Sequence, residues 1–170
     1  MLRNFSSYFV NKFQPATILY KQQLKKVSSS SPPVLKPVLG ERASTIKTFS
    51  NQDVQTFAEL TGDDNPLHFD HKFVNQSGVF QKPIVHGALV NGLVSGVIGT
   101  QLPGPGSVVV EQSSRFLAPL YVGDTVRVEV IITSIKKRFL DLAIECINMD
   151  AEEEKKVMLG KVTVMMTKKN

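Results

Sequence analysis

Alternation of apolar and polar positions dominates the second half of the chain. From Asp124 to Ser134, β-branched residues at every second position alternate with mostly polar ones, the pattern of a strand with one buried face. Three further stretches in this half of the chain have strand character. A shorter alternating stretch, rich in β-branched residues, lies nearer the N-terminus. The five predicted strands span residues 43–49, 107–116, 124–134, 139–148 and 156–167.

Helical spacing is confined to the region between the first predicted strand and the second. Ser50 followed by Asp53 resembles a capping box, and apolar residues then recur at helical spacing as far as Gly62. The segment 87–100 is apolar on almost every side and too short to span a bilayer, which predicts a helix buried within the domain. Its glycines would each cost about 1 kcal/mol relative to alanine, so we expect close approach of a sheet or ligand at 87, 92, 96 and 99.

The order of these elements indicates the fold class. One strand is followed by a helical region and then by four consecutive strands, two pairs of which are joined by short polar connections at 136–138 and 150–154. This order predicts an α+β fold, in which one antiparallel sheet packs against one buried helix. A chain of 170 residues suits a single domain with an appended segment.

The net charge of +5 belongs to the first 40 residues, which contain six basic residues and no acidic one. The other 14 basic and all 15 acidic residues give the rest of the chain a charge of −1. A basic, hydroxyl-rich, acid-free segment without a long apolar run is typical of a mitochondrial transit peptide, and a basic arm for nucleic acid or an anionic surface is the alternative. We therefore predict a targeting leader and linker over 1–40 and one domain over 41–170. The single cysteine, Cys146, indicates a reducing compartment.

The most specific polar stretch surrounds Asp63 and His68. Gly62 and Pro66 prevent a continuous helix, and Asn65, which precedes the proline, must be extended or turn-like. The chain therefore bends between Asp63 and His68 and can bring both side chains to one side. A carboxylate and an imidazole that meet at one water can move protons at neutral pH.

Two other interpretations of this stretch remain open on the residues alone. Asp63 and Asn65 are favoured in turns for local reasons, with His68 as a packing residue. The second is a metal site, because His68, Asp70, His71 and His86 could ligate a metal ion, but H-x-x-H without a paired acid at helical spacing is a weak signal.

The segment from Pro83 to Gly87 directly precedes the predicted buried helix. At a helix start, Gly87 would present a free backbone N–H at the positive end of the helix dipole, which can bind a carbonyl oxygen that becomes an enolate. The alternative is an ordinary helix start, with His86 packed beneath it.

The two motifs, FAELTGDDNPLHFD at 57–70 and PIVHG at 83–87, together resemble the MaoC-like (R)-specific enoyl-thioester hydratases, also called hydratase 2. The resemblance covers roughly residues 43 to 167. It implies a hot-dog fold, in which an antiparallel sheet wraps around a long buried helix, and a homodimer as the working unit.

The resemblance also implies roles for five residues. Asp63 and His68 match the catalytic pair, and Asn65 matches the asparagine that helps to shape their turn. Gly87 matches the oxyanion-hole N–H, and Ser95 matches a position that lines the active site.

The expected reaction is the reversible dehydration of (3R)-3-hydroxyacyl thioesters of acyl carrier protein or CoA to trans-2-enoyl thioesters. It requires no cofactor and no metal, and with the leader it implies fatty-acid synthesis in the mitochondrial matrix. We expect no membrane or nucleic-acid partner. The alternatives are a hot-dog acyl thioesterase and a non-catalytic protein that binds acyl chains or RNA. The near-neutral domain, whose densest basic run is only Lys136 to Arg138, argues against the RNA-binding version.

Overall fold

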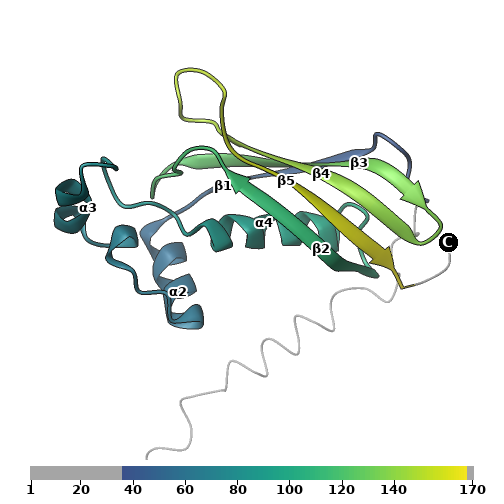
Figure 1. Cartoon of the computed structure of the whole chain (residues 1–170), viewed down its shortest axis with the longest axis horizontal. Coiled ribbons are helices and arrows are strands. Elements are labelled where there is room, and N and C mark those ends of the chain that lie inside the picture. The colour runs from purple at the N-terminus through teal and green to yellow at the C-terminus, as the bar shows by residue number, and fades with distance from the viewer. Residues whose placement is uncertain (1–35, 168–170) are drawn as a thin grey trace, which may run out of the picture. The chain divides into compact units, whose positions relative to one another are not determined.

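The computed structural model describes residues 36–167 and contains one five-stranded antiparallel sheet with a long helix against it (Figure 1). Neighbouring strands pair in the order β1-β3-β4-β5-β2. All five predicted strands are present, with bounds within two residues of those expected. They are β1 (Arg42–Thr48), β2 (Ser107–Phe116), β3 (Thr125–Lys136), β4 (Phe139–Asn148) and β5 (Lys155–Met166).

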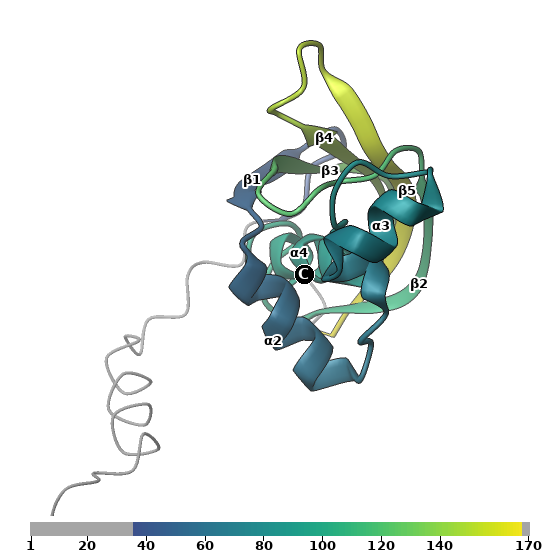
Figure 2. The same cartoon turned by 90° about the vertical axis from the view of Figure 1, so that its left-hand side faces the viewer.

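Helical segments fill the region between β1 and β2, so the α+β prediction is confirmed. They are α2 (Asn51–Thr61), the short 3₁₀ helix η1 (Pro66–His68), α3 (His71–Ser77) and α4 (Gly87–Thr100). The sheet curves around one side of α4, as the view along that helix shows, and α2 and α3 lie at the near end (Figure 2).

The hydrophobic core lies between the sheet and one face of α4. Each inward-facing residue of β3 alternates with an outward-facing one, and burying an aliphatic side chain of this size contributes about 1.5–3 kcal/mol. The most deeply buried contributions of β3 and α4 are Val126, Val128, Val130, Ile132, Val94, Val97 and Ile98, each at most 2% exposed.

The other face of α4 is exposed, which corrects one expectation about its glycines. A Cβ on Gly92, Gly96 or Gly99 would meet no atom within 4 Å, so the sheet does not approach the helix there. Only Gly87 is closely approached, by the ring of Phe116, which lies 2.6 Å from the position of an added Cβ. The exposed face is a stripe of small residues, Ala88, Gly92, Ser95, Gly96 and Gly99.

Helix α2 begins with the predicted capping box. The Ser50 hydroxyl accepts from the Asp53 N–H at 3.2 Å, and the Asp53 carboxylate accepts from the Ser50 N–H at 2.8 Å. Hydrogen bonds from Ser50 and from Lys47 lower the pKa of Asp53 to about 2. The helix ends at Gly62, whose φ of 77° is the left-handed conformation that favours glycine.

Helix α3 is not among the predicted elements. Its seven residues bury only Val74, which is too little for a helical hydrophobic pattern. The signals that define it are local caps. The Asp70 carboxylate accepts from the N–H groups of Lys72 and Phe73, and Gly78 ends the helix with a φ of 66°.

Two further sequence predictions concern the N-terminal leader and the single cysteine. The leader and linker, 1–40, lie outside the described residues except for the last five positions. Cys146 is buried in β4, and burial raises the pKa of its thiol to about 12, so the reactive thiolate does not form at neutral pH.

Within residues 36–167, no helix combines the length and hydropathy needed to cross a membrane.

Candidate active site

The turn after α2 brings Asp63 and His68 together. Gly62 ends the helix, and the Asn65 side chain accepts from the Leu67 N–H at 3.1 Å, which starts η1 with Pro66 as its first residue. Because η1 completes only one turn, the chain folds back and brings the His68 ring near the Asp63 carboxylate. The Asn65 side chain thus holds the turn.

The segment before α4 forms the second wall of the site. The Ile84 N–H donates to the carbonyl of Leu67 at 3.1 Å, and the Val85 N–H donates to the carbonyl of Leu120 at 2.8 Å. Ile84 also forms a β-bridge with Tyr121. These bonds hold the segment between η1 and the loop that leads into β3.

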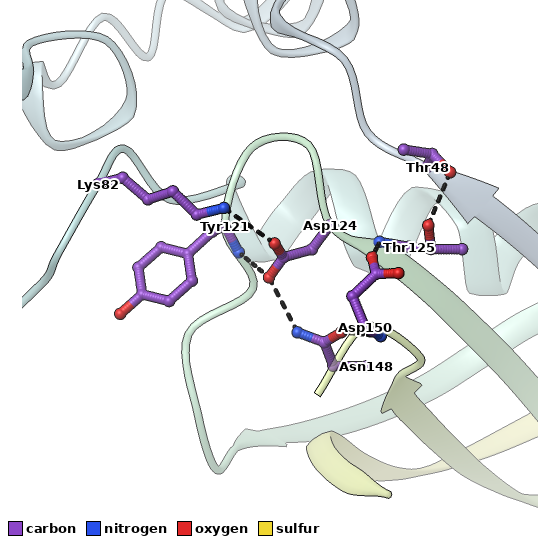
Figure 3. A network of polar contacts seen from close by, with 7 residues as sticks. All are labelled: Thr48, Lys82, Tyr121, Asp124, Thr125, Asn148 and Asp150. Carbon is purple, nitrogen blue, oxygen red and sulfur yellow. Dashed lines mark hydrogen bonds and ion pairs between the residues drawn. The ribbon is translucent and has the colours of Figure 1, made fainter. Parts of the chain in front are cut away.

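Asp124 reinforces that loop at the start of β3 (Figure 3). Its carboxylate, 8% exposed, accepts from the Lys82 ammonium at 3.2 Å, the Tyr121 N–H at 3.1 Å and the Asn148 amide at 2.9 Å. Three donors compensate the loss of hydration that a buried carboxylate suffers. Thr125, the next residue, is tied to β1 and to the loop after β4, so the site is anchored to the sheet.

The hydrogen bonds of His68 define its tautomer. Nδ1 lies 2.7 Å from the Ile84 carbonyl oxygen, which can only accept, so Nδ1 carries the proton and Nε2 keeps the lone pair. Burial lowers the pKa of His68 below its ordinary value, His86 lowers it further, and the Ile84 carbonyl and Asp63 oppose the shift. The ring is therefore neutral at neutral pH and able to accept a proton at Nε2.

His86 completes the cluster from beneath. Its ring is stacked on that of His68, with 3.6 Å between centroids and 25° between planes, and its Nε2 lies 3.0 Å from the Asp63 carbonyl oxygen. A carboxylate oxygen of Asp63 and one ring nitrogen of each histidine all lie within 4.8 Å of one another. Two groups that bond to one water at a tetrahedral angle lie about 4.5 Å apart, so Asp63 and His68 are close enough for one water to bond to both.

The same three residues are poorly arranged for a metal ion. A metal lies in the plane of each imidazole that binds it, whereas stacked rings direct their lone pairs side by side and not toward one point.

Helix α4 begins beside this cluster with an uncapped N-terminus. Its N-cap is His86, which makes no side-chain capping bond, whereas the caps of α2 and α3 are filled by Ser50 and Asp70. Among the described residues, no acceptor faces the N–H of Gly87. This donor and the helix dipole are available to an incoming oxygen.

An apolar pocket with a volume of about 410 Å³ adjoins Gly87. Its size falls in the range of roughly 300–1,000 Å³ that is common for small-molecule sites. The walls come from the segment before α4, α4 itself, the end of β2 and β5, and include Ile84, Val90, Phe116, Leu120 and Met158.

Two residues of the site region differ between the sequence prediction and the structure. Ser95 lies two turns beyond Gly87, about 12 Å along the axis of α4, and its side chain is exposed on the small-residue stripe. In the described part of the chain it makes no hydrogen bond to Asp63 or His68, so its predicted role stays a prediction.

His86 was not among the predicted site residues. Its position one residue before Gly87 in the PIVHG motif was the available signal.

Comparison with known proteins agrees with this geometry. The family described as MaoC like domain matches residues 32–158. The chain belongs to the MaoC-like family.

Three similar proteins illustrate this membership. The (R)-specific enoyl-CoA hydratase of Rhodospirillum rubrum is 40% identical over 129 residues, which cover 75% of this chain and 86% of that protein. The mitochondrial 3-hydroxyacyl-[acyl-carrier-protein] dehydratase FERN of Solanum lycopersicum is 34% identical over 143 residues, 82% of either chain. The solved (R)-hydratase from A. caviae involved in PHA biosynthesis has a TM-score of 0.72 at 35% identity and covers 78% of this chain and 98% of that one. The predicted family and hot-dog fold of this MaoC-like protein are thus confirmed.

Proposed function

We propose that this MaoC-like protein reversibly dehydrates (3R)-3-hydroxyacyl thioesters of acyl carrier protein or CoA to trans-2-enoyl thioesters, in mitochondrial fatty-acid synthesis. Its class is that of a hydro-lyase, as the names of its relatives state for those proteins. The observation that carries the proposal is the position of the Asp63 and His68 side chains, spaced for one water beside the uncapped N-terminus of α4.

The paired residues supply the proton transfers. In the hydration direction, a water held between the Asp63 carboxylate and Nε2 of His68 attacks C3 of the enoyl group. One member of the pair accepts a proton from the water as the C3–O bond forms, and a proton is returned to C2. The sum is addition of OH and H across the double bond, and the pair ends in the protonation state in which it began.

Gly87 supplies the electrostatic part. As the C3–O bond forms, electron density moves through C2 onto the thioester oxygen, which gains negative charge until C2 is protonated. The N–H of Gly87 and the positive end of α4 stabilise that charge, so this donor is matched to the transition state. Neither step uses a cofactor.

The apolar pocket is the proposed site of the acyl chain. A thioester oxygen bound at the Gly87 N–H would lie at the wall of this pocket. Ile84 also lines the pocket, and its carbonyl accepts the hydrogen bond from His68, so the pocket and the pair share this segment. Phe116 packs on Gly87 and narrows the pocket at that point.

A second copy of this chain is the proposed partner. The unpaired edge of β2 exposes Val108, Val109 and Val110 by 43%, 39% and 51%, and α4 exposes its stripe of small residues. In a two-fold dimer, β2 of one subunit would pair with β2 of the other, so that the two sheets become continuous. The small-residue stripes of the two α4 helices would then be buried against each other.

The catalytic pair gives the first prediction. Asp63→Asn removes the base at nearly constant size, and His68→Gln removes the titrating ring, so each should lower kcat by about 10² to 10⁴ with little change in folding. The double variant should be scarcely worse than either single one, because the groups act together. Asp64→Asn and His71→Gln, which change exposed neighbours, serve as matched controls.

The assay follows hydration of crotonyl-CoA by loss of the enoyl absorbance, with thiol release measured in parallel. Near wild-type hydration by either folded pair variant contradicts the assignment, and thiol release without hydration would identify a thioesterase.

The pocket gives the second prediction. Phe116→Ala should enlarge the pocket and shift kcat/KM toward longer enoyl chains, by roughly fourfold for each further methylene buried at about 0.8 kcal/mol. The measurement is kcat/KM for straight-chain enoyl-CoA substrates of increasing length from crotonyl upward. Phe139→Ala, at an exposed phenylalanine outside the pocket, is the control. An identical chain-length profile in wild type and Phe116→Ala would place the acyl chain elsewhere.

The oligomeric state gives the third prediction. The wild-type protein should sediment as a dimer, and Gly96→Glu should shift it to the monomer, because two carboxylates would meet at the two-fold axis. Asn75→Glu adds the same charge on the exposed face of α3 and should leave the dimer intact. A monomeric wild-type protein in sedimentation velocity would rule the interface out.

Localisation gives the fourth prediction. Residues 1–40 fused to a fluorescent reporter should direct it to mitochondria, and the same segment with its six basic residues changed to glutamine should not. Microscopy with a mitochondrial dye reads the result. A reporter that stays in the cytosol with the native segment argues against organellar delivery by this leader.

A further inference from the structure

His86 is a buried titratable residue that the proposed reaction does not use. Its side chain is 1% exposed, and it contacts both members of the pair that the reaction does use. On its remaining sides it packs against aromatic rings, those of Phe57 and Phe69, at centroid distances of 4.9 and 5.9 Å. A group this deeply buried acts on the reaction through its neighbours.

The first of these contacts fixes the backbone of Asp63. A carbonyl oxygen only accepts, so Nε2 of His86 must donate to the Asp63 carbonyl across their 3.0 Å separation. The other ring nitrogen, Nδ1, has no hydrogen-bond partner among the described residues, and the other contacts of the ring must offset this cost.

The second contact fixes the ring of His68. The His86 ring lies 3.6 Å from it, centroid to centroid, so the His68 imidazole cannot rotate toward the helix without displacing a fully buried group. The bond from Nδ1 to Ile84 controls the rotation of His68 in its own plane, and His86 controls the tilt of that plane.

From these contacts we propose that His86 is a positioning residue, which holds the Asp63 backbone through Nε2–H and the His68 ring through its face. This inference rests on the proposed function for its catalytic consequence, but the two contacts are independent of any substrate.

The arrangement also affects the protonation of His68. The titratable groups that act on it are Asp63, from the loop after α2, and His86, from the segment before α4. Asp63 raises the pKa of His68, and His86 and burial lower it. Loss of His86 should therefore raise the pKa of His68. If neutral His68 is the active form, the acid limb of kcat/KM should then move to higher pH.

Three variants separate the two contacts. His86→Gln keeps an N–H donor within reach of the Asp63 carbonyl but loses the stacking face, His86→Phe keeps the face but loses the donor, and His86→Ala loses both. We expect kcat to fall about tenfold for His86→Gln and His86→Phe and about a hundredfold for His86→Ala, with KM changed much less. His71→Gln, at the exposed histidine, is the control.

The decisive measurements are the pH profile of kcat/KM and an NMR titration of the His68 ring nitrogens in the full-length protein. The pKa of His68 should rise in all three His86 variants and stay constant in His71→Gln. Unchanged kcat and an unchanged His68 titration in folded His86→Ala would overturn the proposal, as would activity losses that only follow the unfolded fraction measured by urea titration. A wild-type protein without hydratase activity would instead refute the proposed function, and the NMR titration would still decide whether His86 positions His68.

Discussion

The clamp on the backbone from Pro83 to Val85 is the constraint on which the rest of the site depends. Its N–H and carbonyl groups bond to η1 on one side and to the loop before β3 on the other. The carbonyl of Ile84 accepts a hydrogen bond from Nδ1 of His68 at 2.7 Å. A shift of this segment would therefore change the orientation of the His68 ring, the start of α4 and the wall of the pocket together.

The clamp in turn depends on a buried charge. Asp124 loses nearly all its hydration and recovers it from three donors, one of which is Lys82 at the start of the clamped segment. A buried carboxylate with its donors removed is costly, so the network favours a single arrangement of the loop and sheet. The turn that carries Asp63 and His68 is thus held by polar contacts, whereas the rest of the domain is held by aliphatic packing.

Helix α4 shows how one element serves both purposes. Its inward face packs on the sheet through valine and isoleucine, and its uncapped N-terminus leaves the Gly87 N–H available to an oxygen. Its outward face is the stripe of small residues, which no part of the described chain covers. Within residues 36–167, only one face of this apolar helix is therefore buried.

The sequence by itself determined the strands, α2 and α4, because alternation, helical spacing and capping are local properties that the backbone obeys wherever the chain lies. It also predicted the bend between Asp63 and His68, because Gly62 and Pro66 prevent a continuous helix there, and the helix start at Gly87. Helix α3 was too short for a pattern, and only its caps at Asp70 and Gly78 mark it. The stack of His86 on His68, the donors to Asp124 and the pocket at Gly87 were decided by the tertiary structure. Each joins residues from separate elements, whose approach depends on how the sheet curves around α4, and no spacing along the chain encodes that distance.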